Sequence, residues 1–193
     1  LLSWARGVAL RAGAERLASG SPSPLLRLQE AVADRLVLGK IRAALGLDAL
    51  TVAITGSAAT SRDVMDFFLS LGLPLHEVYG QSEVTGPTTF NRPEPGKTRL
   101  GTVGLPVPGV EVRLAEDGEI LVRGGNVFVG YYKDPEATAE TLRDGWLHSG
   151  DVGEFDRDGF LRITDRKKDL IKTSGGKYAA PQPIEKQLQD IDV

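Results

Sequence analysis

The chain has 193 residues, of which 41% are hydrophobic, which is enough for one substantial domain or two small ones. Its 23 basic and 26 acidic side chains give a formal net charge of −3, so the basic excess typical of nucleic-acid-binding proteins is lacking. We therefore expect no nucleic-acid partner. The chain has no cysteine, which excludes disulfides, thiolate metal sites and thiol catalysis within these residues.

The first 20 residues, LLSWARGVALRAGAERLASG, are apolar enough to be compared with a signal peptide. Arg6, Arg11 and Arg16 interrupt each apolar run, so the pattern predicts an amphipathic helix instead. No segment reaches the apolar length of a membrane-spanning helix. We expect a cytoplasmic protein and leave peripheral membrane contact open. Because the sequence does not begin with Met, we also expect it to be an internal part of a longer chain.

A second helix is predicted after the Ser-Pro-Ser-Pro sequence at 21–24, where proline marks a helix start. Apolar residues then recur at helical spacing, which predicts that they pack into a core. These residues are Leu25, Leu28, Val32 and Leu36.

Residues 50–79 have the pattern of a strand, a helix and a second strand. The segments 50–55 and 73–79 are strand-like, and Gly72 is placed to end the helix between them. The apolar face expected on that helix consists of Val64, Phe67, Phe68 and Leu71. Such a βαβ unit predicts parallel strands, and ligands of parallel sheets bind beyond the carboxyl ends of the strands. The loops at 56–58 and 79–80 follow those ends.

The sequence pattern changes near residues 92–99, where proline, glycine and short alternating strands replace long helices, and we expect a boundary there. Two hairpins are predicted, with Asp117-Gly118 and Asp158-Gly159 at their turns. The segment 156–159 lacks the further ligands of a calcium loop, so we interpret it as a turn. His76 and His148 have no nucleophile motif near them, and we interpret both as structural.

Four motifs in order resemble the signature motifs of the adenylate-forming (AMP-binding) superfamily. They are YGQSE at 79–83, GEILVRG at 118–124 followed by GYY at 130–132, GWLHSGD at 145–151, and DRKKD at 165–169. Longer stretches, at 91–112, 130–151 and 165–185, are similar to bacterial long-chain fatty acid CoA ligases. The resemblance covers nearly the whole chain.

The resemblance implies a mixed α/β fold in three parts. Residues 1–95 would be the end of a large parallel-sheet domain that retains a βαβ unit, 96–164 a small antiparallel β subdomain, and 165–193 a hinge and the start of a C-terminal lid. It also implies the activity: a fatty acid is activated with ATP and Mg²⁺ to an acyl-adenylate, and the acyl group is transferred to coenzyme A. The partners would be the fatty acid, ATP and coenzyme A, with the oligomeric state left open.

The resemblance implies site residues as well. Glu83 would be catalytic and the magnesium ligand, because a carboxylate is a hard oxygen donor. Asp151 would accept hydrogen bonds from the ribose hydroxyls, and Arg166 would donate to the same ribose. Tyr79 would stack on adenine. The full set of nucleotide or coenzyme contacts is Gly56, Ser57, Ala58, Tyr79, Gly80, Gln81, Ser82, Asp151, Arg166 and Gly175.

The second half-reaction would use the start of the lid. Lys168 is the hinge implied by the resemblance, and rotation about it would bring Lys172, a catalytic candidate, and the loop at 174–176 toward the adenylate. In one place the sequence departs from the family pattern: Gly56-Ser57-Ala58-Ala59 stands where the family usually has Gly-Gly-Ala-Pro.

Two further elements of the family, a phosphate loop ending in lysine and a C-terminal adenylation lysine, have no counterpart in these 193 residues. We therefore expect the chain by itself to be inactive. Two alternatives stay open at this point: another adenylate-forming enzyme, such as a peptide-synthetase adenylation domain or a luciferase, and a noncatalytic nucleotide-binding or interaction module.

Overall fold

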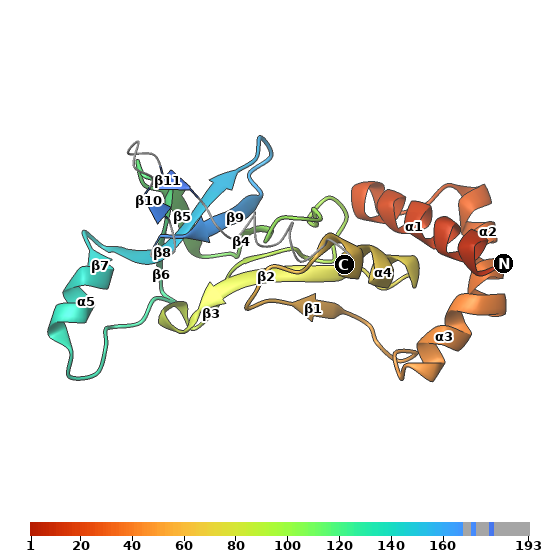
Figure 1. Cartoon of the computed structure of the whole chain (residues 1–193), viewed down its shortest axis with the longest axis horizontal. Helices are drawn as coiled ribbons and strands as arrows, with labels where there is room; N and C mark the ends of the chain where they lie inside the picture. The colour runs from red at the N-terminus through yellow and green to blue at the C-terminus, as the bar shows by residue number, and fades with distance from the viewer. Residues whose placement is uncertain (168–170, 173–177, 180–193) are drawn as a thin grey trace. The chain divides into compact units, whose positions relative to one another are not determined.

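The computed structural model describes residues 1–167, 171–172 and 178–179. The chain divides into two compact units, which are described separately below (Figure 1). Unit 1 consists of Leu1–Val78 and Asn91–Gly104, and unit 2 of Tyr79–Phe90 and Leu105–Val193. Within the described part of the chain, no helix is both long and apolar enough to cross a membrane.

Unit 1 begins with a set of helices: α1 (Leu2–Ser19), α2 (Pro24–Ala33), the π-helical segment η1 (Asp34–Leu38) and α3 (Gly39–Ala44). The helix expected for the first 20 residues is confirmed. The buried residues of α1 recur every three or four positions, so one face of the helix is apolar and mostly small. They are Ala5, Val8, Ala9, Ala12 and Gly13.

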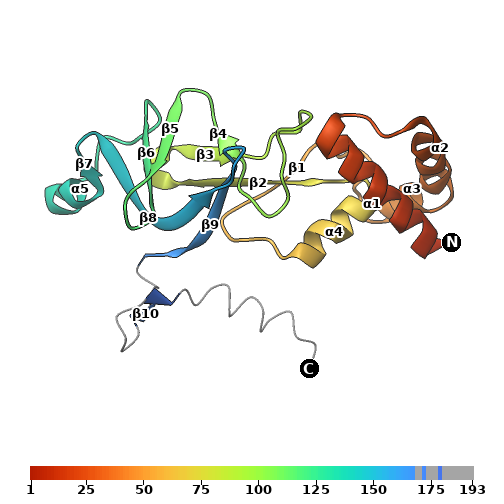
Figure 2. The same cartoon turned by 90° about the horizontal axis from the view of Figure 1, so that it is seen from above.

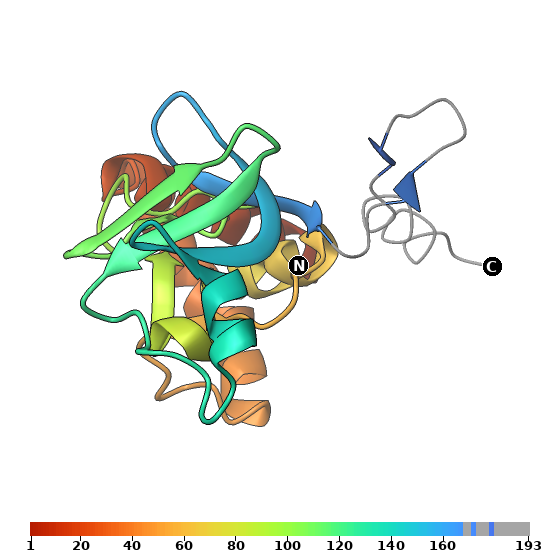
Figure 3. The ribbon, with the colours of Figure 1, turned by 90° about the vertical axis from the view of Figure 1, so that its left-hand side faces the viewer.

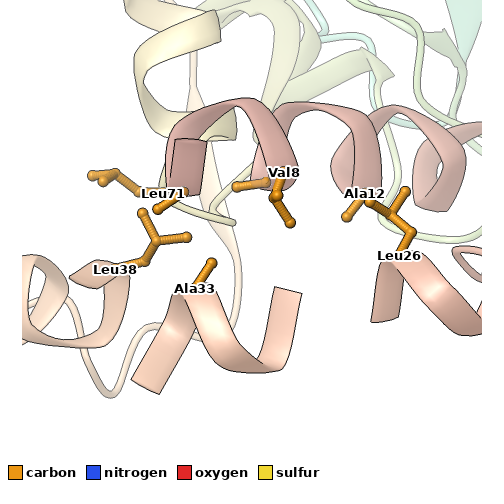
Figure 4. Close-up of a cluster of buried hydrophobic side chains, with 8 residues drawn as sticks. Val8, Ala12, Leu26, Ala33, Leu38 and Leu71 are labelled. Atoms are coloured by element: carbon orange, nitrogen blue, oxygen red, sulfur yellow. The ribbon is translucent and has the colours of Figure 1, made fainter. Parts of the chain in front are cut away.

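The helices of unit 1 share a buried core, shown in Figure 4. Val8 and Ala12 point from α1 toward α2, where Leu26 and Ala33 meet them, and Leu38 of η1 lies in the same cluster. The short side chains of α1 let the neighbouring helix approach closely. Each buried leucine then contributes about 2 kcal/mol through the apolar surface that it removes from water.

The apolar stripe predicted to pack into this core is exposed instead. Leu25 and Leu28 are 68% and 64% exposed, and Val32 and Leu36 are 42% and 47% exposed. The prediction was wrong because apolar residues occur on both faces of α2, and Leu26 with Ala33 faces the core. The π-helical turn at η1 also shifts the phase of the residues that follow it.

The predicted βαβ unit is confirmed. Strand β1 (Ala53–Thr55) pairs in parallel with β2 (Leu75–Gln81), and helix α4 (Arg62–Ser70) connects them. Ser61 caps the helix by accepting a hydrogen bond from the Val64 amide, and Gly72 (φ 76°) follows its last turn in the left-handed conformation. The predicted buried face was partly wrong. Val64 and Phe67 are 43% and 42% exposed, whereas Met65 and Leu69 are buried.

In unit 2 the chain turns sharply after β2. The 3-10 segment η2 (Ser82–Val84) leads into β3 (Gly86–Phe90), which pairs antiparallel with β4 (Leu105–Pro106). A Cβ atom on Gly80 would lie 1.9 Å from the carbonyl oxygen of Gly86, so only glycine allows the two backbones to approach this closely. The end of β2 is thereby fixed next to the start of β3.

The larger sheet of unit 2 has the order β5-β6-β8-β7, with β9 paired to β8 (Figures 2 and 3). The strands are β5 (Val110–Leu114), β6 (Glu119–Gly124), β7 (Leu142–Arg143), β8 (Trp146–Phe155) and β9 (Leu161–Arg166), and helix α5 (Pro135–Thr141) precedes β7. Both predicted hairpins are confirmed: Val112 lies opposite Val122 in the first, and Glu154 opposite Arg162 in the second. Ile120, Val122, Leu147 and Leu161 are fully buried.

A last antiparallel pair joins β10 (Ile171–Lys172) and β11 (Tyr178–Ala179). The mixed α/β class is thus confirmed. The predicted domain limits at 95/96 and 164/165 stay a prediction. The two compact units of the structure are divided at 78/79, 90/91 and 104/105.

Candidate nucleotide-binding site

Asp151 is the buried centre of a polar cluster in unit 2. The Tyr79 hydroxyl, from the end of β2, donates a hydrogen bond of 2.8 Å to Asp151 Oδ2. Arg166 Nε, from the end of β9, donates to Asp151 Oδ1 at 3.2 Å. The Asp151 side chain is only 10% exposed. Three strands therefore bring one carboxylate, one phenol and one guanidinium together.

The backbone around Asp151 explains why the cluster forms. Asp151 lies opposite Arg166 in the β8–β9 ladder, so the two side chains belong to paired positions. Gly150 precedes Asp151 with φ 74°, a left-handed conformation that glycine adopts without strain. The Lys167 amide donates to the Gly150 carbonyl at 2.8 Å. This hydrogen bond links the residue before Asp151 to the residue after Arg166.

The chemistry of Tyr79 is fixed by its surroundings. Burial raises the pKa of the Tyr79 phenol well above its usual value, and the neighbouring Asp151 carboxylate raises it further. The phenol therefore keeps its proton over the physiological range and remains a donor to Asp151. Each carboxylate oxygen has more than one acceptor site, so Asp151 can still accept from two hydroxyls of a ligand.

Glu83 occupies the η2 turn that follows β2. The Tyr131 hydroxyl donates to Glu83 Oε1 at 2.7 Å, and the Phe128 amide donates to the Glu83 carbonyl at 2.8 Å. The hydrogen bond to Glu83 and, secondarily, burial raise the pKa of Tyr131. Glu83 is partly exposed. One accessible carboxylate is a typical protein contribution to Mg²⁺ when nucleotide phosphates supply the other oxygens, so the residue fits that ion.

A cleft of about 680 Å³ lies beside these residues in unit 2. Gln81 and Glu83 line it from the end of β2 and η2, and Ser149 and Gly150 line it from β8. Ser82, between Gln81 and Glu83, is exposed. Of the predicted site residues, Gln81 and Glu83 therefore line the cleft, together with Ser149 and Gly150, which directly precede Asp151 in the chain.

The remaining predicted contacts are distributed differently. Gly56, Ser57 and Ala58 are exposed in the loop after β1, and they belong to unit 1. Ser57 has φ 70°, and a Cβ on Gly56 would lie 2.8 Å from Val78 Cγ1, so a larger residue would not fit there without a shift. Their expected contact with adenine stays a prediction.

The lid residues are only partly within the structure. Lys168 and Gly175 lie outside the described residues. Lys172 belongs to β10, where its backbone pairs with Tyr178 of β11. The predicted hinge and coenzyme contacts therefore stay predictions.

One cluster was not predicted from the sequence. Glu119, at the start of β6, is 4% exposed and accepts hydrogen bonds from His148, Gly150 and Lys167. A glutamate directly before the apolar run ILV was the available signal, because a charged residue in a buried strand needs partners. His76 is buried and bonds to Thr98 at 3.0 Å, which supports its structural interpretation. His148 bonds to Glu119 at 3.1 Å and also lines the cleft, so its structural interpretation stays a prediction.

Comparison with known proteins identifies the family of the chain. Residues 15–132 match the family described as AMP-binding enzyme. The chain belongs to this family. Among its relatives, the long-chain-fatty-acid–CoA ligase FadD15 of Mycobacterium tuberculosis is 46% identical over 88% of this chain and 28% of its own length. The long-chain-fatty-acid–CoA ligase ACSBG2 of Xenopus laevis is 39% identical over 98% of this chain and 26% of its own length.

Solved structures of family members have the same fold. The ATP-bound structure of MatB from Rhodopseudomonas palustris aligns with a TM-score of 0.66 and 32% identity, over 73% of this chain and 30% of MatB. The anthranilate CoA ligase AuaEII in complex with anthranoyl-AMP aligns with a TM-score of 0.66 and 26% identity, over 74% of this chain and 29% of AuaEII. The chain spans between 24% and 33% of the length of the curated relatives that it matches.

Proposed function

We propose that the protein containing this chain is a long-chain fatty acid CoA ligase. In the first half-reaction the fatty acid carboxylate attacks the α-phosphorus of ATP, and pyrophosphate leaves. In the second, the thiol of coenzyme A loses its proton and attacks the acyl carbonyl, and AMP leaves. The relatives named long-chain-fatty-acid–CoA ligase, at 46% and 39% identity, support the acyl class.

The observation that carries this proposal is the arrangement of Asp151 between Tyr79 and Arg166. One proton donor occupies each carboxylate oxygen, and each oxygen keeps acceptor capacity for one of two adjacent hydroxyls. A ribose presents such a pair of hydroxyls. The Arg166 side chain is 67% exposed, so its guanidinium has N–H groups that can reach the same sugar.

The other residues have roles that follow the course of the first half-reaction. Gln81, the last residue of β2, lines the cleft, and Ser82 is the exposed residue that follows it. Both side chains can donate to phosphate oxygens. Glu83 would hold Mg²⁺, which, when bound, neutralises the charge that develops on the phosphates. Tyr79 and Gly80, together with Gly56, Ser57 and Ala58, would flank the adenine.

The lid carries the second half-reaction in this proposal. Lys168 would be the hinge, because it follows Lys167, whose amide is still bonded to β8. Rotation would bring Lys172 and the loop containing Gly175 toward the adenylate, where a glycine leaves space for the pantetheine arm of coenzyme A. The protein would work in the cytoplasm, and peripheral membrane contact is left open.

The test is pyrophosphate exchange by the full-length protein that contains this sequence, across carboxylic acids from acetate to palmitate and a set of amino acids. We expect exchange with long-chain acids, followed by thioester formation when coenzyme A is added. Exchange with amino acids alone would favour a peptide-synthetase activity, and AMP binding without exchange would favour a noncatalytic module. The 193 residues by themselves should give no thioester above a buffer blank.

A further inference from the structure

A single buried carboxylate holds three donors in unit 2. Glu119 Oε1 accepts from the Gly150 amide at 3.0 Å. Glu119 Oε2 accepts from Lys167 Nζ at 2.8 Å and from His148 Nδ1 at 3.1 Å. Because an ionised carboxylate only accepts, His148 carries its proton on Nδ1 in this arrangement. The donors are 29, 31 and 48 residues away in sequence, so Glu119 connects β6 with β8 and the end of β9.

The charge of Glu119 is retained despite its burial. Burial favours the neutral acid, but the hydrogen bonds from Lys167, His148 and the Gly150 amide outweigh it and lower the pKa of Glu119. Asp117 Oδ2 lies 2.7 Å from the same Lys167 ammonium, which is thereby held from two sides. The hydrogen bonds to Asp117 and Glu119 raise the pKa of Lys167, so this ion pair persists at neutral pH.

Two of the donors are direct chain neighbours of the residues proposed to bind ribose. Gly150 precedes Asp151, and Lys167 follows Arg166. The Lys167 amide also donates to the Gly150 carbonyl, so these two residues are bonded to each other as well as to Glu119. Glu119 therefore fixes the chain directly before one member of the pair and directly after the other, although it contacts neither Asp151 nor Arg166 in any hydrogen bond described above.

We propose that Glu119 is a positioning residue that sets Asp151 and Arg166 in the geometry for ribose hydroxyls by holding Gly150 and Lys167. This inference rests on the proposed function, since that function makes ribose the ligand of the pair. Lys167 directly precedes Lys168, the proposed hinge, so its bond to Glu119 would keep the ribose contacts in place during the proposed rotation.

The experiment compares two nucleotides, AMP and 2′,3′-dideoxy-AMP, in calorimetric titrations of the full-length protein. They differ only in the hydroxyls that Asp151 would accept from. Glu119→Gln is nearly isosteric, but it replaces one acceptor oxygen by an N–H group, which faces a donor in either orientation. The matched control is Glu111→Gln, on neighbouring β5, where the glutamate is exposed and pairs only with Arg123 among the contacts described here.

We expect the wild-type protein and Glu111→Gln to prefer AMP to the same degree. In Glu119→Gln the preference should fall about tenfold, as for the loss of a charged hydrogen bond, while binding of the dideoxy nucleotide changes little. An equal loss for both nucleotides, or an unchanged preference, would overturn the positioning role while leaving the ribose assignment intact. A wild-type protein with no preference would overturn the ribose assignment itself and this inference with it.

A second variant covers the case in which Glu119→Gln fails to fold. Lys167→Met removes the ammonium from a side chain that is 42% exposed and keeps an unbranched chain of similar length. Its preference for AMP should fall in the same direction, by about threefold. A Lys167→Met protein with the wild-type preference and a native melting curve would contradict the proposal.

Discussion

The two carboxylates of the candidate site are held in different ways. Asp151 is 10% exposed, and both of its oxygens are bonded to side chains from other strands. Glu83 lies in a turn, is partly exposed, and accepts from the hydroxyl of Tyr131, which is itself 38% exposed. A preorganised group loses little further freedom when a ligand binds, whereas a loosely held group is ordered by the ligand. We infer that folding alone fixes the orientation of the Asp151 side chain, whereas the Glu83 side chain takes its final position only when a ligand binds.

The largest effect is expected from removing the carboxylate that the fold has preorganised. Asp151→Ala should weaken binding of ATP and of acyl-adenylate alike, by about a hundredfold, because two hydrogen bonds to a charged group are lost. The measurement is calorimetric titration of the full-length protein with ATP and with a stable acyl-adenylate analogue. Wild-type affinity for ATP would contradict the ribose role.

The next effect should be confined to one half-reaction. Glu83→Gln keeps the shape of the side chain but removes its charge, so adenylation should fall about thirtyfold across magnesium concentrations. Thioester formation from supplied acyl-adenylate should fall much less, since it no longer requires the metal-bound triphosphate. Paired single-turnover assays check this difference, and an unchanged rate of pyrophosphate exchange would refute the metal-ligand role.

A smaller effect should follow from loosening Asp151 without removing it. Tyr79→Phe keeps the ring but deletes the hydroxyl that donates to Asp151 Oδ2. We expect AMP affinity to fall about tenfold, because a buried carboxylate oxygen loses its donor. Binding of 2′,3′-dideoxy-AMP serves as the control, since the ring contact is the same for both nucleotides. If the two affinities fall together, the hydroxyl supports the pocket as a whole and not the ribose contact.

The smallest effect is expected at the corresponding phenol beside Glu83. Tyr131→Phe should reduce adenylation only about threefold, because the contact is partly exposed and solvent can replace the lost donor. Tyr132→Phe is the matched control, since that neighbouring side chain is 88% exposed. A loss of adenylation in Tyr131→Phe that exceeds the loss of adenylation in Tyr79→Phe would reverse the comparison between the two carboxylates.

The helical part of unit 1 shows where reasoning from sequence was inaccurate. Helical spacing identified a stripe containing Leu25 and Leu28, but α2 buries Leu26 and Ala33 instead. Periodicity identifies a helix and its apolar residues. It does not decide between two apolar faces, because that choice depends on which surface of α1 is available to pack against.

The sequence by itself determined the local elements and the family motifs. Strand alternation with Asp-Gly at the turn defines both hairpins, and strand, helix and strand within 30 residues define the βαβ unit, because such patterns depend on neighbours in the chain. Asp151 and Glu83 could be named as candidates from their motifs. The tertiary structure alone decided the partners of those carboxylates. Tyr79 and Asp151 are 72 residues apart, and Glu119 and Lys167 are 48 apart. Such contacts depend on the order of strands in the sheet and on the need of each buried carboxylate for hydrogen-bond donors. A local sequence pattern determines neither of these.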